Sequence, residues 1–64
     1  MATGERIRGR EISIEVDEGP DGWVAVGIVQ EGLGPERGMR FEACAADPNE
    51  AEQRLKVEIE AAFA

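Results

Sequence analysis

A nearly continuous apolar run from Trp23 to Val29 constrains the fold of this chain more than any other feature. Segments rich in glycine and proline bound the run on both sides, which predicts a strand from about Trp23 to Gln30. A strand without alternating apolar and polar residues is usually covered on both faces. We therefore place this strand at the centre of a sheet.

The two faces of the central strand carry different apolar residues, which are Val24, Val26 and Ile28 on one face and Trp23, Ala25, Gly27 and Val29 on the other. A single helix covers only one face, and we expect the face of Trp23 to stay open. Exposed apolar patches mark interfaces, and tryptophan is enriched at interface hot spots. The candidate interface residues are Trp23, Ala25, Val29 and Val57. The alternative is that Trp23 folds over the strand edge and packs on its own hairpin.

Two further strands flank the central one. From Arg10 to Asp17 apolar and polar residues alternate, which predicts a strand with one face on a core and one in water. Residues 18–22 form a five-residue hairpin loop to the central strand. A longer glycine-rich loop, residues 31–38, leads to a third strand from about Met39 to Ala45. That loop lacks the Lys-Ser/Thr ending of a phosphate-binding loop.

The last part of the chain predicts a helix that runs to its end. Asp47 is a good N-cap, Pro48 suits the first helical position, and Glu50 completes a capping box. The apolar residues fall on one stripe at helical spacing: Ala51, Leu55, Ile59, Ala62 and Phe63. Val57 points away from this stripe, so we expect it to be exposed in a monomer.

These elements predict an α+β fold, in which a three-stranded antiparallel β-meander is followed by one C-terminal helix packed on one sheet face (β-β-β-α). With 64 residues the chain has room for one small domain, which we place at residues 10–64. Residues 1–9 are expected to form a flexible basic arm, because terminal residues are usually poorly ordered.

The charge distribution restricts the class of partner. The formal net charge is −7, and it is uneven: residues 1–10 carry three arginines and one glutamate, whereas residues 11–64 carry four bases and thirteen acids. Nucleic acids and anionic membranes both require clustered lysine and arginine. We therefore expect a protein partner, either a second copy in a homodimer or a basic protein, and neither nucleic acid nor membrane.

The side chains available for catalysis are few. The chain has no histidine or tyrosine, and its nucleophiles are Thr3, Ser13 and Cys44. Without histidine no Ser-His or Cys-His pair can form, and a metal site would consist of carboxylates alone. We therefore expect a protein that is not an enzyme, with no catalytic residue, metal or cofactor. A single cysteine excludes an intrachain disulfide, and without a signal peptide or membrane span we expect a cytoplasmic location.

Two short motifs resemble the HicB antitoxin-type domain, a partial ribonuclease-H-like β-β-β-α unit. They are Asp21-Gly22-Trp23-Val24-Ala25 at the start of the central strand and Asp47-Pro48-Asn49-Glu50-Ala51 at the start of the helix. The resemblance covers about residues 10–63. It implies an acidic domain that masks a small basic RNA-cleaving toxin, often as an oligomer.

The chain also departs from that family. The family's Pro-Asp-Leu-Pro-Gly-Cys segment is replaced by residues 30–37, and no DNA-binding tail is present before Ala64. No functional residue of the family carries over.

Two alternatives remain: an acidic inhibitor or adaptor of a basic enzyme, and a remnant of a ribonuclease-H-like, metal-dependent hydrolase. The chain is also similar to the β-β-β-α end of double-stranded-RNA-binding domains. Asn49, Glu50 and Glu52 stand where those domains have lysines that bind phosphate, so we do not expect RNA binding.

Overall fold

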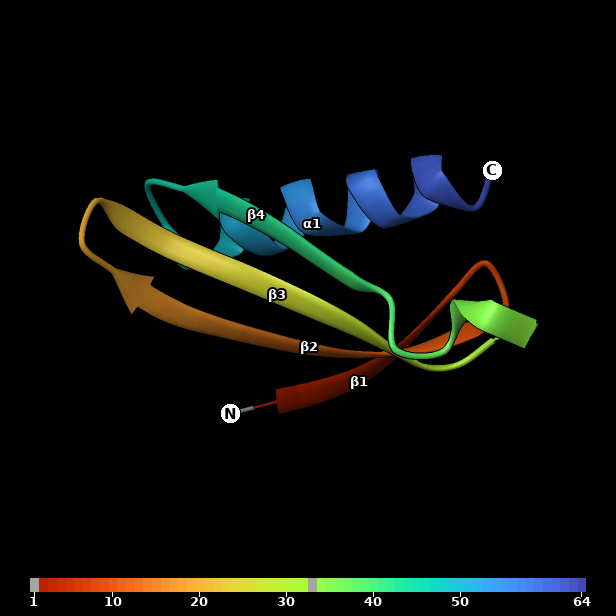
Figure 1. Ribbon diagram of the computed structural model, residues 1–64. Helices are drawn as coiled ribbons and strands as arrows, with labels where there is room; N and C mark the ends of the chain where they lie inside the picture. The colour runs from red at the N-terminus through yellow and green to blue at the C-terminus, as the bar shows by residue number, and fades with distance from the viewer. Residues whose placement is uncertain (1, 33) are drawn as a thin grey trace.

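Four antiparallel strands form one sheet, and a single helix packs along one face of it (Figure 1). The computed structural model describes residues 2–32 and 34–64. The strands follow one another across the sheet in chain order, so the topology is a meander. The elements are β1 (Ala2–Ile7), β2 (Arg10–Gly19), β3 (Gly22–Glu31), a short 3₁₀ turn η1 (Gly34–Glu36), β4 (Arg40–Ala45) and α1 (Pro48–Ala62).

The α+β fold class and the antiparallel meander are confirmed, but the predicted number of three strands is wrong. The additional strand, β1, lies where the basic arm was predicted, and it pairs with β2 from Ala2↔Glu15 to Ile7↔Arg10. The connection is a two-residue turn in which Arg8 and Gly9 have positive φ values of 52° and 80°. Such turns match the twist of hairpin strands. Met1 of the predicted arm and Leu33 of the predicted loop lie outside the described residues.

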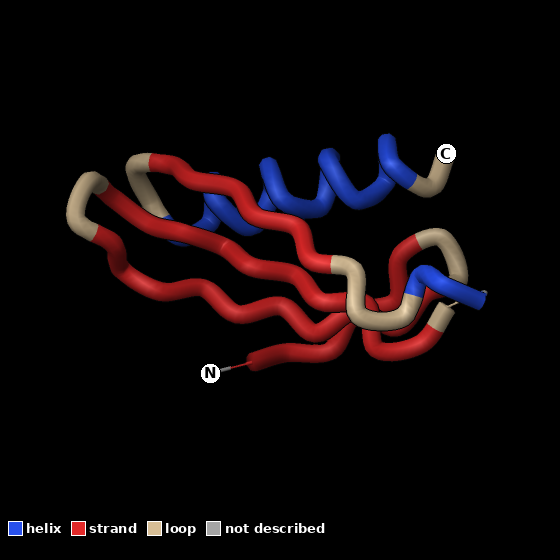
Figure 2. Tube along the Cα trace, viewed as in Figure 1, coloured by secondary structure: helices blue, strands red, loops and turns tan. Residues whose placement is uncertain are grey.

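The hairpin between β2 and β3 is tighter than predicted, and this changes which face of β3 is buried. Gly19 pairs with Gly22, so only Pro20 and Asp21 connect the strands (Figure 2). The resulting register places Val16 opposite Ala25. A five-residue loop closed by Asp17 and Trp23 would instead have placed Val16 opposite Val24. Because side chains alternate along a strand, this shift of one residue exchanges the two faces of β3.

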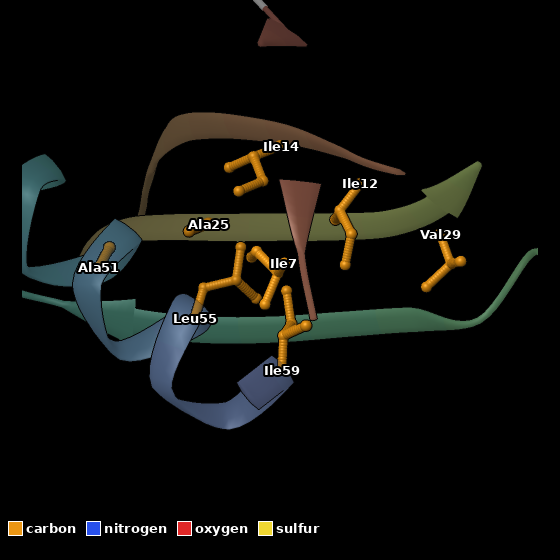
Figure 3. Packing of buried hydrophobic residues seen from close by; sticks show 8 residues of the cluster. All are labelled: Ile7, Ile12, Ile14, Ala25, Val29, Ala51, Leu55 and Ile59. Atoms are coloured by element: carbon orange, nitrogen blue, oxygen red, sulfur yellow. The ribbon is translucent and has the colours of Figure 1, made fainter. Parts of the chain in front are cut away.

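The core lies between α1 and the sheet, and every strand except β4 supplies a buried residue to it (Figure 3). The isoleucines predicted on the core face of β2 are buried as expected. Residues of α1 at helical spacing close the layer from the other side. The buried residues are Ile7, Ile12, Ile14, Ala25, Val29, Ala51, Leu55 and Ile59. Phe41, Ala43 and Ala45 of β4 pack against this cluster and are partly buried.

Gly27 allows α1 to approach β3 closely. A Cβ atom at this position would lie 3.1 Å from Ile59 Cδ1 and 3.3 Å from both Ile12 Cγ2 and Leu55 Cδ2. The neighbouring core residue on the same face, Ala25, is also small and fully buried. The helix therefore lies over the smallest part of β3, and the large side chains of β2 and α1 fill the space on either side.

The helix begins where the sequence predicts, but of the predicted capping box only the bond to Asp47 is found among the described residues. Asp47 Oδ1 accepts a hydrogen bond of 2.8 Å from the Glu50 backbone N–H, and Pro48 occupies the first turn. The Glu50 carboxylate pairs with Arg54 at 2.8 Å. Lys56 lies between two acids, Glu52 at 3.0 Å and Glu5 of β1 at 3.1 Å, and so ties the helix to the edge of the sheet.

Arg10, the first residue of β2, contacts both the η1 turn and the residue that follows α1. Its guanidinium contacts Glu36 of η1 through two hydrogen bonds of 2.8 and 2.7 Å. It also lies 4.2 Å from the centre of the Phe63 ring, which in turn packs edge-on against Phe41. The loop after β3 and the end of α1 are thereby held against β2.

No helix in residues 2–32 and 34–64 is long and apolar enough to cross a membrane.

Candidate protein-binding surfaces

The structure divides the four predicted interface residues between the core and the surface. Ala25 and Val29 are 0% and 1% exposed and lie under α1, and Trp23 packs against the same cluster and is half-buried. The prediction that the helix leaves this face open is therefore wrong, for the reason of register given above. Val57 is 66% exposed on α1, as predicted.

The open face of the sheet is the opposite one, where three apolar residues follow one another along the central strand β3. Val24 and Val26 are half-buried and Ile28 is 38% exposed. No second layer of secondary structure covers this face in the described residues, since α1 lies on the other side. We call Val24, Val26 and Ile28 the open-face strip.

Polar side chains flank the open-face strip on both neighbouring strands. Pairing in the sheet places the residues in three rows: Ser13–Ile28–Arg40, Glu15–Val26–Glu42 and Asp17–Val24–Cys44. The carboxylates of the second and third rows lie beside the strip and are exposed to solvent. Arg40 at one end of the strip pairs with Glu42 at 3.0 Å. The surface is thus apolar along its centre and mainly acidic at its borders.

A groove lies beside this face, between the edge strand β4 and α1. It has a volume of about 600 Å³. The helix contributes residues spaced three and four apart, which therefore share one side of α1. The lining residues are Glu42, Ala43 and Cys44 of β4 and Glu50, Gln53, Arg54, Val57 and Glu58 of α1. Val57 is thus a wall residue of this groove.

The three nucleophilic side chains lie on three different strands, β1, β2 and β4. Cys44 is exposed and lies on β4 between Ala43 and Ala45. The Thr3 hydroxyl donates a 3.5 Å hydrogen bond to the Ile14 carbonyl, and Ser13 is half-buried beside the open-face strip. In residues 2–32 and 34–64, no group of three or more His, Cys, Asp or Glu side chains is placed to hold a metal ion.

Two basic groups are electrostatically perturbed. Hydrogen bonds to Glu52 and then to Glu5 raise the pKa of the Lys56 ammonium above its usual value. The hydrogen bonds to Glu36 likewise raise the pKa of Arg10. Both perturbed cations thus join secondary-structure elements and lie outside the groove and the open-face strip.

The apolar character of both faces of β3 is evident from the sequence, but the face predicted to be open is the buried one. The signal that could have corrected this prediction lies in β2, where Ile12, Ile14 and Val16 form the core face. Two-residue hairpin loops are the commonest kind, and a loop of Pro20-Asp21 pairs these residues with Val29, Gly27 and Ala25. The groove beside β4 was missed because it depends on how α1 packs on the sheet.

Comparisons with protein-family models, with curated proteins and with solved structures found no match.

Proposed function

We propose that this protein is a non-catalytic interaction module that binds a basic protein partner through the open-face strip and its acidic borders. One observation carries the proposal: the central strand β3 is apolar on both faces, and α1 covers only one of them. Residues on a central strand are commonly packed on both sides. A partner protein would supply the second layer.

Charge complementarity indicates the kind of partner. Glu15, Asp17 and Glu42 lie beside the strip, and the whole chain carries a net charge of −7. Acidic borders attract basic surfaces and repel acidic ones, which increases the rate of association with basic proteins. This role agrees with what the HicB-type resemblance implies, and the cytoplasmic location predicted from the sequence belongs to the same proposal.

A second copy of the chain, the homodimer predicted from the sequence, is the competing occupant. Two open-face strips can pack on each other, but the row containing Glu15 and Glu42 then brings acids from both copies together. Salt screens such repulsion. Self-association should therefore strengthen as ionic strength rises, whereas binding of a basic partner should weaken.

The proposal is tested by affinity capture with three purified baits: the wild type, a Val26→Thr/Ile28→Thr variant, and an Ala61→Thr control altered at an exposed position of α1 outside both the strip and the groove. Each captured protein is purified and titrated against the same three baits by calorimetry. We expect a partner that binds the wild type and the control and loses affinity for the strip variant. A partner that binds all three equally would contradict the proposal, as would a monomer that captures nothing.

A further inference from the structure

The outer edge of β4 offers backbone hydrogen-bonding groups to a further strand. β4 is the last strand of the sheet, with β3 on one side only. Arg54 Nη1 donates a 3.2 Å hydrogen bond to the Cys44 carbonyl, which places that carbonyl on the outer side. Backbone groups alternate in direction along a strand. The N–H and C=O of Glu42, two residues away, therefore also point outward.

The wall of the groove formed by α1 carries acidic side chains and one apolar residue. Val57 is 66% exposed in the middle of a polar helix surface. Glu50 is paired with Arg54, whereas Glu58 has no ion-pair partner among residues 2–32 and 34–64. Glu42 lies across the groove on β4, where it forms an exposed ion pair of 3.0 Å with Arg40. The groove thus offers carboxylates on both walls and an aliphatic contact near one end.

We infer that this groove binds a basic, extended segment of a partner protein, which adds to the sheet as a further strand beside β4. Backbone hydrogen bonds to Glu42 would align the segment, and its lysine or arginine side chains would approach Glu42 and Glu58. Glu50 and Glu58 are eight residues apart on α1, or about 12 Å along the helix. An extended segment covers that distance with about four residues.

A second copy of this chain is a poor occupant of the groove. Pairing of one β4 edge with another would bring the acidic walls of both copies together, and like charges that face each other are destabilising. A basic segment instead meets Glu58 on the helix wall and Glu42, which is shared with Arg40, on the strand wall, while Arg54 is the one cation among the described residues of the lining. The groove shares Glu42 and Cys44 with the border of the open-face strip, whereas Val57 and Glu58 belong to the groove alone and Val26 and Ile28 to the strip alone, so variants of these residues distinguish the two proposals.

The test is a titration of the isotopically labelled protein with the peptide acetyl-Lys-Val-Lys-Val-Lys-Val-Lys-amide, followed by NMR. We expect the amide resonances of Glu42, Cys44 and Val57 to shift and hydrogen exchange at the Glu42 amide to slow. The same peptide with glutamate in place of lysine should cause no shift. Bound peptide should also slow the alkylation of exposed Cys44, which lies in the groove.

Two pairs of variants separate groove binding from general attraction. Glu58→Lys should weaken binding about tenfold, because it replaces attraction with repulsion, whereas Glu60→Lys makes the same charge change on α1 outside the groove and should have less effect. Glu42→Pro removes the outward N–H and should abolish binding. Glu42→Thr removes the same carboxylate but keeps the N–H, so it should retain part of the affinity.

Three results would overturn the inference. Equal weakening by Glu58→Lys and Glu60→Lys would mean that the peptide binds by net charge alone. Shifts centred on Val24, Val26 and Ile28 would place the peptide on the open face of the sheet. Shifts of Glu42 and Cys44 on concentrating the protein without peptide would show that a second copy occupies the edge.

Discussion

Gly27 shows how a single missing side chain positions the helix. Any Cβ there meets Ile59, Leu55 and Ile12 at 3.1–3.3 Å. The structure accommodates α1 at this distance only because β3 is small at this point. Neighbouring side chains would have to move before a larger residue could fit.

We predict that Gly27→Val lowers the free energy of unfolding by about 1–3 kcal/mol, the usual cost of overfilling a packed core. Urea denaturation followed by circular dichroism measures it. Gly4→Val is the matched control, because a Cβ on Gly4 has no atom within 4 Å, and it should be close to neutral. A Gly27→Val protein as stable as the wild type would mean that α1 does not lie over Gly27.

Residue types alone did not predict the contacts that join distant parts of the chain. Arg10 and Glu36 are 26 residues apart, yet their side chains are 17% and 19% exposed and directly paired. Nothing in the local sequence around Arg10 distinguishes it from Arg6 or Arg8, which lie at the surface. Such a pair exists only once the sheet and the η1 turn are in place.

Among the elements, α1 was the most predictable, because its signals are local. Asp47, Pro48 and the buried residues Ala51, Leu55 and Ile59 occupy the positions that the sequence predicts, whereas Ala62 of the predicted stripe is exposed and Phe63 follows the end of the helix. β1 was missed because its pattern is weak: Ile7 is the large apolar residue that it contributes to the core. A strand with so few apolar residues forms because its backbone pairs with the free edge of β2.

The N-cap of α1 can be tested directly. Asp47→Ala removes the acceptor of the Glu50 N–H and should lower the free energy of unfolding by about 1 kcal/mol. Asp47→Ser retains a side-chain acceptor and should restore most of that loss. Thermal unfolding of the two variants measures both effects. Equal stability of Asp47→Ala and the wild type would show that the cap does not stabilise α1.

Lys56 should make the packing of α1 on β1 sensitive to alkaline pH. Its pKa is raised in the folded state by Glu52 and Glu5. A raised folded-state pKa stabilises the fold while lysine is charged, and the effect disappears as pH rises through that pKa. We expect stability to fall as pH rises above the usual lysine pKa of about 10.4 in the wild type and to fall less in Lys56→Gln. No tyrosine titrates in this range. An identical alkaline slope in both proteins would contradict this assignment.

At the scale of the whole molecule, the fold class was predictable but the functional surface was not. Hydrophobic alternation in β2 and the helical stripe determine that one helix packs on an antiparallel sheet. Which face of β3 remains open depends on whether the hairpin loop has two residues or five. A feature of one turn, at Pro20 and Asp21, thus decides the surface offered to a partner.

Solution mass, measured by light scattering over a tenfold range of concentration and at two salt concentrations, tests the proposed partner class. We expect a monomer at low salt, because the acids beside Val26 would repel one another in a face-to-face dimer. Any dimer should form at high salt and be lost in Val26→Thr/Ile28→Thr. A stable dimer at low salt that survives this double substitution would contradict the assignment of the open face.

The helix α1 covers one face of β3 and leaves the other face for a partner. One chemical change made on each face tests this most directly: Val29→Thr places a hydroxyl in the core, and Val26→Thr places the same hydroxyl on the open face. The free energy of unfolding from urea denaturation should fall by about 1–3 kcal/mol for Val29→Thr. It should change by about 0.5 kcal/mol or less for Val26→Thr. The reverse order would mean that the helix covers Val24, Val26 and Ile28, and would contradict the account.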